Sequence, residues 1–187
     1  NRIITYHGLQ VMNDKPRLAI QVLKNLKKVE TITSSTLAFQ FGPLMNAAGR
    51  LKDADLAVRF LLSNDRQEAE KMAQILDATN AERREKESEM IQTALKLADE
   101  QKNNPALILV SPEFHEGVNG IVATRLVESF YKPVLILSEN EGKIKGSGRS
   151  IPELNLKDVL SDCSDLLVRF GGHAAAAGCS LIPKNLE

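Results

Sequence analysis

Apolar residues recur at helical intervals through residues 1–62, which predicts a series of short helices. One covers residues 3–12, and a second begins at Lys15-Pro16, because proline is favoured in the first turn of a helix. A third covers residues 31–41, and Gly42-Pro43 is expected to end it. A small-residue turn over residues 46–50 and a further helix over residues 53–62 complete this helical segment.

Residues 65–102 contain no glycine or proline and predict one long helix, with capping oxygens supplied by residues 63–65. Its middle is polar on nearly every side, as in helices that bridge domains through solvent. For its two ends, a surface helix with one shallow apolar face fits equally well. The charge run over residues 82–87 is most simply a solvated face with opposite charges three and four residues apart. We therefore place a domain boundary within or near this helix.

Beyond Pro105 the pattern changes to alternating strands and helices. Strands over residues 106–110 and 133–137 flank a helix over residues 117–131, which predicts a parallel crossover. A more exposed strand over 143–148, helices over 156–163 and 166–170, and a closing strand over 178–182 follow. The predicted fold class is α/β: a helical N-terminal piece, a long connecting helix, and a compact domain with a mixed, mainly parallel sheet.

Composition limits the possible partners. The 187 residues carry 24 basic and 24 acidic side chains, so any site for a polyanion must be a local cluster rather than a basic face. Cys163 and Cys179 are too few for a disulfide framework or a four-cysteine zinc site, which fits a reducing cytoplasm. The apolar runs are too short to span a membrane. Because the chain opens at Asn1 without methionine, we interpret it as a piece of a longer protein.

The surface with the smallest side chains is expected around residues 169–178, where Gly171, Gly172 and His173 precede four alanines. Another molecule can approach such a backbone closely, and glycine permits the conformations that a tight turn needs. If a helix begins at the alanines, its unpaired N–H groups form a seat for phosphate, with His173 beside the anion. The alternative is a tight turn that feeds a closely packed helix, with His173 as a structural residue.

Two further small-residue turns end in arginine. Ser147, Gly148 and Arg149 form a second anion-type loop, in which the guanidinium offers a bidentate fork to phosphate oxygens. The alternative is a surface hairpin whose arginine binds no ligand. Residues 46–50 form another small-residue turn, which ends in Arg50. We expect the three turns, distant along the chain, to converge on one phosphate.

His115 and Glu116 follow the first strand of the α/β segment, at the edge where ligands gather in open α/β sheets. Gly117 and Gly120, near the start of the next helix, permit close approach of a ligand or another strand. His115 alternatively caps or orients the loop. Arg125 lies about two helical turns along and is placed to reach the same edge, with an ordinary salt bridge as its alternative.

Catalytic ligands are not evident in the sequence. Metal-dependent phosphodiester hydrolysis needs clustered Asp and His, whereas His7, His115 and His173 lie far apart. No nucleophile elbow, Walker loop or metallohydrolase helix motif is present. By itself the chain is typical of the part of an enzyme that binds the substrate, rather than the part that carries the catalytic residues.

Four segments of the chain, taken together, resemble the RecJ family of single-strand-specific 5'-to-3' exonucleases, in the DHH phosphoesterase superfamily. These segments are residues 46–50, residues 115–125 from His115 to Arg125, residues 146–150 and residues 169–178. The resemblance covers nearly the whole chain. It implies the end of a DHH domain over residues 1–62, a connecting helix over 63–104 and a DHHA1 domain over 105–187.

The same resemblance implies the chemistry. The metal-binding motifs would lie upstream of Asn1, so Mn²⁺ or Mg²⁺ would serve the intact enzyme and none would be bound here. This piece is then inactive alone and holds single-stranded DNA, in repair and recombination, as a monomer without a membrane partner. The implied phosphate and nucleic-acid contacts are Arg50, Arg125, Ser147, Gly148, Arg149, Gly171, Gly172 and His173, with His173 as catalytic support.

Two other functions remain open from the sequence. A DHHA1 module of a nanoRNA or cyclic-dinucleotide phosphodiesterase shares the Gly-Gly-His turn, although the long polar helix favours the RecJ family. A non-catalytic nucleotide-binding or interaction module is favoured if the gene lacks metal ligands upstream.

Overall fold

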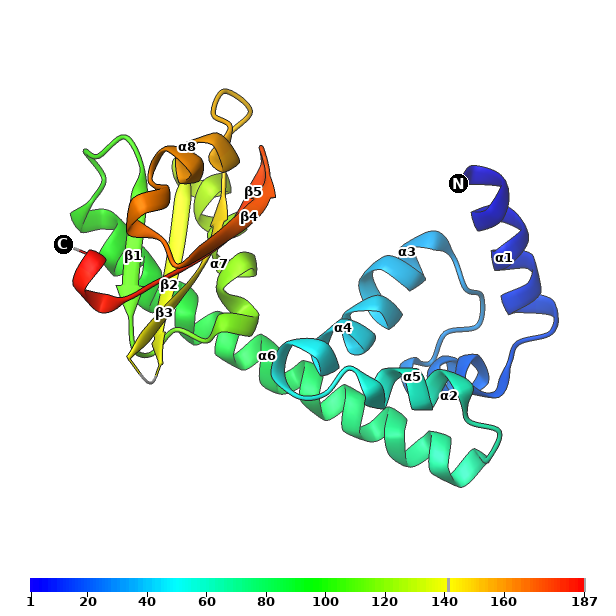
Figure 1. Ribbon diagram of the computed structural model, residues 1–187. Coiled ribbons are helices and arrows are strands. Elements are labelled where there is room, and N and C mark those ends of the chain that lie inside the picture. Colours follow the sequence, from blue (N-terminus) through cyan, green and yellow to red (C-terminus); the bar gives the residue numbers. More distant parts are fainter. Residues whose placement is uncertain (141, 187) are drawn as a thin grey trace. The chain divides into compact units, whose positions relative to one another are not determined.

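The computed structural model describes residues 1–140 and 142–186 (Figure 1). It divides into two compact units, Asn1–Arg84 and Glu85–Glu187, which are described separately below. The division falls inside the long helix α6 (Arg66–Glu100), the helix at which we placed a boundary. No helix in the described part of the chain is both long and apolar enough to cross a membrane.

The first unit is helical, as predicted, but one helix continues where we expected it to stop. Its elements are α1 (Arg2–Asp14), α2 (Leu18–Lys27), α3 (Ser34–Thr36), a π-helical turn (Leu37–Phe41), α4 (Gly42–Leu51), α5 (Asp55–Leu62) and the first part of α6. The expected stop at Gly42-Pro43 is wrong. The π-helical turn runs directly into α4, and Pro43 sits in the first turn of α4, a position where proline is tolerated.

The predicted turn over residues 46–50 is also wrong, because these residues lie inside α4. Ala47 and Ala48 are fully buried in the helical core, so their small size serves helix packing rather than an open surface. Alanine is the best helix former, and this preference outweighs the turn tendency of Asn46 and Gly49. Arg50 is exposed in the last turn of α4, where a cation is favourable to the helix dipole.

Both ends of α6 are packed. Ala69, Met72, Ala73 and Leu76 belong to the core of the first unit. Met90, Ala94 and Ala98 are buried near its other end. A single helix thus contributes apolar residues to the cores on both sides of the division, which explains why the sequence pattern is apolar at the ends and polar between them.

The second unit is built on a five-stranded sheet in the order β1-β2-β3-β5-β4. Its elements are β1 (Leu107–Ser111), α7 (Glu116–Phe130), β2 (Val134–Asn140), β3 (Lys143–Arg149), α8 (Leu156–Asp162), a 3-10 turn (Ser164–Leu166), β4 (Arg169–His173), β5 (Ala176–Leu181) and a 3-10 turn (Pro183–Asn185). The α/β class and the mixed sheet are confirmed.

The sheet is mainly antiparallel, so the expected parallel majority is wrong. β1 and β2 pair in parallel, joined through α7 as predicted, and the other three pairs are antiparallel. Very short links join β2 to β3 and β4 to β5, and such links can join antiparallel strands alone. A parallel pair needs a long crossover, which α7 supplies for β1 and β2.

The C-terminal hairpin replaces two predicted helices. The helix expected over residues 166–170 is a 3-10 turn followed by the start of β4, and the alanines after His173 form a turn and β5 instead of a helix. Ala177, Cys179 and Leu181 alternate into the core with a period of two. Pairing of β5 with both β3 and β4 overrides the helix preference of alanine.

The two faces of the sheet are packed differently. One face is covered by α8, seen in orange over the sheet in Figure 1, whose Leu156 and Leu160 join Leu137, Ile144 and Cys179 in one core cluster. The other face is covered by α7, which contacts β2 and β3. On this second face the exposed β4 lies beyond α7, and that leaves one region of the sheet open.

Candidate nucleic-acid interface

Beside α7 on this face of the sheet lies a three-by-three array of residues on β3, β5 and β4, which we call the floor; its β4 residues are exposed and most of its β3 and β5 residues are half-buried. Its rows follow the strand register: Lys145, Ser180 and Arg169; Ser147, Gly178 and Gly171; Arg149, Ala176 and His173. Directly opposed residues of antiparallel strands share a face. Arg149 identifies that face, because its guanidinium lies against Gly120 of α7. The centre of the floor is small, and its four corners carry Lys145, Arg149, Arg169 and His173.

The glycines of β3 serve the opposite face. A Cβ added at Gly146 would lie 2.4 Å from Leu137, and one added at Gly148 would lie 2.6 Å from Leu156. Both glycines are therefore required by close packing under α8. The interpretation of residues 146–150 as a glycine loop that cradles an anion is wrong, since residues 143–149 form a central strand whose backbone pairs with β2 and β5. The expected anion contact of Gly148 stays a prediction that this packing does not support.

Arg149 is held from two sides. Its Nη1 donates a hydrogen bond of 2.8 Å to the carbonyl of Gly148, and its guanidinium contacts the helix at Gly120. His173 occupies the same row, two strands away, which corresponds to a Cα separation of about 10 Å. The sheet thus brings the predicted segments 146–150 and 169–178 together, although neither is the loop or helix start that the sequence suggested.

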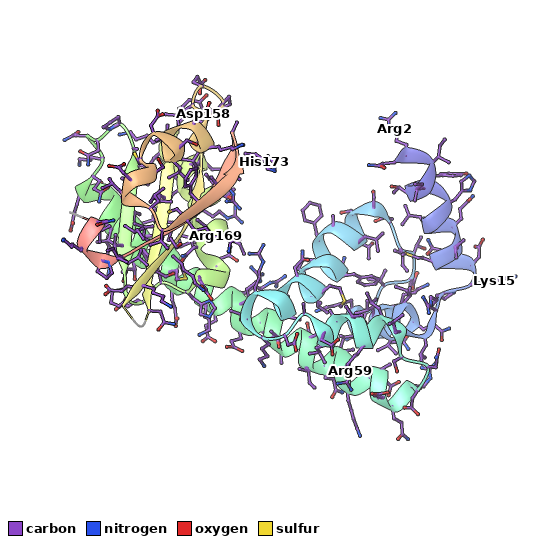
Figure 2. All side chains as sticks on the ribbon, viewed as in Figure 1. Arg2, Lys15, Arg59, Asp158, Arg169 and His173 are labelled. Atoms are coloured by element: carbon purple, nitrogen blue, oxygen red, sulfur yellow. The ribbon has the colours of Figure 1, made fainter. Side chains whose placement is uncertain are left out.

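Gly172 shapes the hairpin that carries His173. Its φ of +146° is a conformation that side chains rarely adopt, and an added Cβ would lie 2.5 Å from the backbone of β5. Gly171, in contrast, has nothing within 4 Å of an added Cβ. The two glycines therefore have different roles: Gly172 is needed for the turn, and Gly171 leaves the surface open. Figure 2 shows Arg169 and His173 along this strand.

A pocket of about 780 Å³ lies at the other end of the sheet, where β1 and β2 end. Its wall includes the predicted pair His115 and Glu116, together with three lysines and three further glutamates: Lys86, Lys143, Lys145, Glu89, Glu113 and Glu139. The position at the carboxyl ends of these strands agrees with the expectation for an open α/β sheet. Its charges are mixed, unlike those at the corners of the floor.

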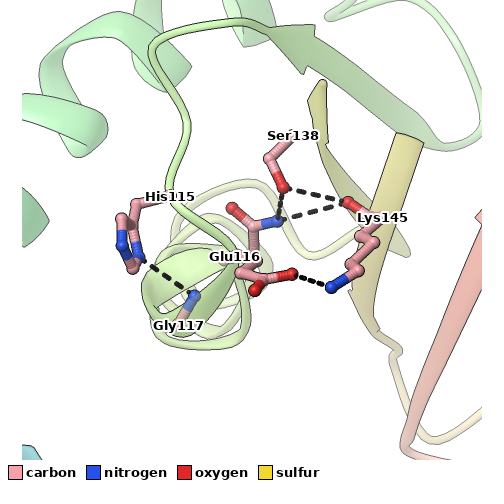
Figure 3. A network of polar contacts seen from close by, with 6 residues as sticks. His115, Glu116, Gly117, Ser138 and Lys145 are labelled. Carbon is pink, nitrogen blue, oxygen red and sulfur yellow. Dashed lines mark hydrogen bonds and ion pairs between the residues drawn. The ribbon is translucent and has the colours of Figure 1, made fainter. Parts of the chain in front are cut away.

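His115 takes the capping role (Figure 3). It is the N-cap residue of α7, and its Nδ1 accepts a hydrogen bond of 3.1 Å from the N–H of Gly117. Nearby, Glu116 forms an ion pair of 2.6 Å with Lys145, and the buried Asn119 donates a hydrogen bond of 3.0 Å to Ser138. These contacts fasten the first turn of α7 to β2 and β3.

The remaining predicted residues lie elsewhere. Arg125 forms an exposed ion pair of 3.5 Å with Glu128, which is the ordinary salt bridge weighed as its alternative. It lies ten residues along the chain from His115, about 15 Å along the helix axis, so it is not part of the strand-end cluster. Arg50 belongs to the first unit. Its convergence with Arg149 and His173 stays a prediction.

Sequence reasoning missed Arg169, Lys145 and Ser180 as members of the site. Arg169 stands in the glycine-rich segment as the residue before Phe170, but its side of the strand follows only from the pairing with Ser180 and Lys145. The available signal was alternation: in residues 169–173 the odd positions form the floor, and Phe170 packs against the core under α8. The helix assigned there concealed this period of two.

Two side chains of this unit have shifted acidities. Burial raises the pKa of the Cys179 thiol. A hydrogen bond to Glu153, with the negative charge of that carboxylate, raises the pKa of the Tyr131 hydroxyl. Neither residue belongs to the floor, so these shifts reflect packing and a surface contact rather than a proton-transfer site.

The described residues do not fit a divalent metal. Within residues 1–140 and 142–186 no three His, Cys, Asp or Glu side chains come together in a way that could hold an ion. The floor offers cations, hydroxyls and exposed backbone instead. Such an array is suited in shape and charge to an extended anion, because its charges sit at the edges and nothing larger than a methyl or hydroxymethyl group stands between them.

Comparison with known proteins identifies similar chains. The family model of the DHHA1 domain matches residues 103–187. The chain is 39% identical over 186 residues to the single-stranded-DNA-specific exonuclease RecJ of Bacillus subtilis, covering 97% of this chain and 24% of that protein. It is 38% identical over 194 residues to the protein of the same name from Escherichia coli, covering 97% of this chain and 34% of that protein. The chain thus spans about a quarter to a third of the length of these relatives.

Solved structures give the same result. The crystal structure of RecJ in complex with Mn²⁺ from Thermus thermophilus superposes with a TM-score of 0.87 at 34% identity, covering 100% of this chain and 28% of that chain. The corresponding Mg²⁺ complex also gives 0.87, at 33% identity, over 99% of this chain and 30% of that chain. Residues 103–187 thus match the model of the DHHA1 domain, and over nearly its whole length the chain is similar to RecJ-type exonucleases in sequence and fold.

Proposed function

We propose that this chain is the part of a RecJ-like 5'-to-3' exonuclease that holds single-stranded DNA by its phosphates. Residues 1–62 would be the end of a DHH domain, residues 63–104 the connecting helix, and residues 105–187 the DHHA1 domain. The observation that carries the proposal is the row of Arg149, Ala176 and His173, which sets a guanidinium and an imidazole on either side of a methyl group.

The row fits a terminal phosphate. A guanidinium donates two parallel N–H groups to phosphate oxygens, and Arg149 is already oriented by Gly148 and Gly120. Ser147, one row further along the same strand face, adds a neutral hydroxyl donor. The similarity of the relatives, which are named for action on single-stranded DNA, supports a nucleic-acid strand as the source of the phosphate.

The floor is long enough to contact more than one phosphate of a nucleic-acid strand. Arg149 lies four positions along β3 from Lys145, so its row and the row of Lys145 and Arg169 are about 13 Å apart. Arg169 is therefore placed to meet a second phosphate further along the same strand, whereas Lys145 in the same row is already paired with Glu116. This length favours an oligonucleotide over a dinucleotide.

Hydrolysis is assigned to the intact protein. RecJ of Thermus thermophilus was solved in complexes with Mn²⁺ and with Mg²⁺, and a divalent ion at such a site neutralises charge and supplies hydroxide. The described residues of this chain do not fit that ion, so the chain contributes binding and orientation of the strand. We expect the purified chain to show no exonuclease activity with Mn²⁺, measured as release of labelled nucleotides from single-stranded DNA.

The binding test is a titration of the 187-residue chain with an eight-nucleotide DNA that carries a 5'-phosphate or a 5'-hydroxyl. Arg149→Ala should weaken binding of the phosphorylated strand by about ten-fold or more, since hydrogen bonds to charged groups contribute about 1.5 to 3 kcal/mol. Arg125→Ala is the matched control, because it removes an exposed arginine that pairs with Glu128. It should leave the affinity within about two-fold.

Three results would contradict the proposal: no measurable affinity in the unmodified chain, equal affinity of Arg149→Ala, or affinity that does not fall as salt is raised. A 5'-phosphorylated dinucleotide that binds as tightly as the longer strand would instead support a module for small nucleotides.

A further inference from the structure

Gly120 occupies an unusual place in α7. It lies inside the helix Glu116–Phe130, where glycine is less favourable than alanine because it loses more conformational freedom. An added Cβ would have as its three nearest neighbours the atoms Nη2, Cζ and Nη1 of Arg149, at 2.9, 3.4 and 3.5 Å. The space that a side chain would fill is thus taken by the guanidinium of one residue on the adjacent strand.

We infer that Gly120 is a positioning residue for Arg149, an inference that rests on the proposed binding of phosphate by that arginine. The bare helix backbone lets the guanidinium lie directly on α7. Its hydrogen bond from Nη1 to the carbonyl of Gly148 fixes the other side of the group. Because β3 is held between β2 and β5, the arginine is supported by both strand and helix.

The consequence for binding is pre-organisation. An exposed arginine loses much of its rotational freedom when it grips a phosphate, and that loss weakens the complex. Arg149 is already confined before any ligand arrives. A methyl group at position 120 would push the guanidinium away from the helix and out of its row with Ala176 and His173.

Gly120→Ala should weaken binding without lowering stability, which distinguishes this role from a structural one. The contact that Gly120→Ala would tighten is with the far end of a flexible side chain, so the fold can accommodate it by moving that side chain. The helix itself should gain from alanine. We expect the thermal midpoint of Gly120→Ala to be unchanged or raised.

The affinity of Gly120→Ala for the 5'-phosphorylated eight-nucleotide DNA should fall by about three- to ten-fold, while affinity for the 5'-hydroxyl strand changes by less than about two-fold. Gly8→Ala is the matched control: Gly8 also lies inside a helix, and an added Cβ there meets nothing within 4 Å. It should leave both affinities unchanged.

A double variant completes the experiment. In the Arg149→Ala background, Gly120→Ala should have no further effect on binding, since the group that it displaces is gone. If Arg149→Ala weakens binding but Gly120→Ala binds the phosphorylated strand like the unmodified chain, this inference is overturned and the proposed function stands. A lowered thermal midpoint of Gly120→Ala would also overturn it, because the Cβ would then be meeting something less yielding than a side-chain end. If Arg149→Ala itself binds normally, both proposals fail.

Discussion

The two ends of the five-stranded sheet carry similar side chains and use them differently. At the hairpin end, Arg149 and His173 flank small residues on an open face. At the other end, Lys145 is paired with Glu116 and His115 is engaged as a helix cap. A cation that already has a carboxylate partner gains little from a phosphate, because it must first give up that partner. Similar residue types therefore have different roles at the two ends: Lys145 and His115 hold the start of α7 in place, whereas Arg149 and His173 line the candidate ligand site.

The largest effect should follow from changing the backbone of the hairpin. Gly172→Ala places a Cβ 2.5 Å from the backbone of β5 and requires a φ that alanine rarely adopts. We expect the free energy of unfolding to fall by about 2 kcal/mol or more. Urea denaturation measures the loss, and Gly171→Ala is the control, expected to lie within about 0.5 kcal/mol because its Cβ meets nothing. Equal losses for the two variants would show that the hairpin is not held by Gly172.

A smaller effect is expected at the opposite end. His115→Ala removes the acceptor for the N–H of Gly117 and should lower the free energy of unfolding by about 1 kcal/mol. His115→Asn retains a capping oxygen and should restore most of this stability. The exposed His7, replaced by Ala, should have little effect. Oligonucleotide affinity should stay the same in all three variants. A loss of affinity in His115→Ala and His115→Asn alone would instead indicate that His115 contacts the ligand.

The sharpest comparison lies within one row of the floor. Arg169→Gln should weaken oligonucleotide binding by about three-fold and reduce the salt dependence by about one counterion. Lys145→Gln should weaken binding by less than about two-fold, because Glu116 already neutralises Lys145. Fluorescence titrations at several salt concentrations measure both quantities. A larger loss of oligonucleotide affinity for Lys145→Gln than for Arg169→Gln would show that the ion pair with Glu116 does not keep Lys145 from contacting the strand.

The smallest effect concerns pH. Burial raises the pKa of Cys179 above its ordinary 9.0, so the unfolded chain releases this proton at lower pH than the folded chain. Stability from this group is complete below the ordinary pKa and is lost as pH rises toward the folded value. Cys179→Ala should therefore show a shallower fall in the free energy of unfolding between about pH 8 and about pH 10. Cys163→Ala is the matched variant, and an equal change in slope for both would contradict the assignment to Cys179.

The local patterns of the sequence determined much of the fold. Uninterrupted helical spacing indicated α6 within a few residues of its ends, and the strand, helix and strand of residues 106–137 indicated the parallel pair and α7. The same patterns put Arg149, Gly172 and His173 forward as candidates, because glycines beside a cationic or hydrogen-bonding side chain are typical of anion sites. These features depend on near neighbours along the chain, which the sequence displays directly.

Tertiary structure decided the rest, because pairing between distant segments overrides local preference. Alanines that favour a helix became a strand once β3 and β4 lay on either side of them, and the small residues of 46–50 became the buried side of α4. The same pairing chose which face of each strand is open. It separated Arg149 from the packing glycines beside it and brought Arg169, Lys145 and Gly120 into the site.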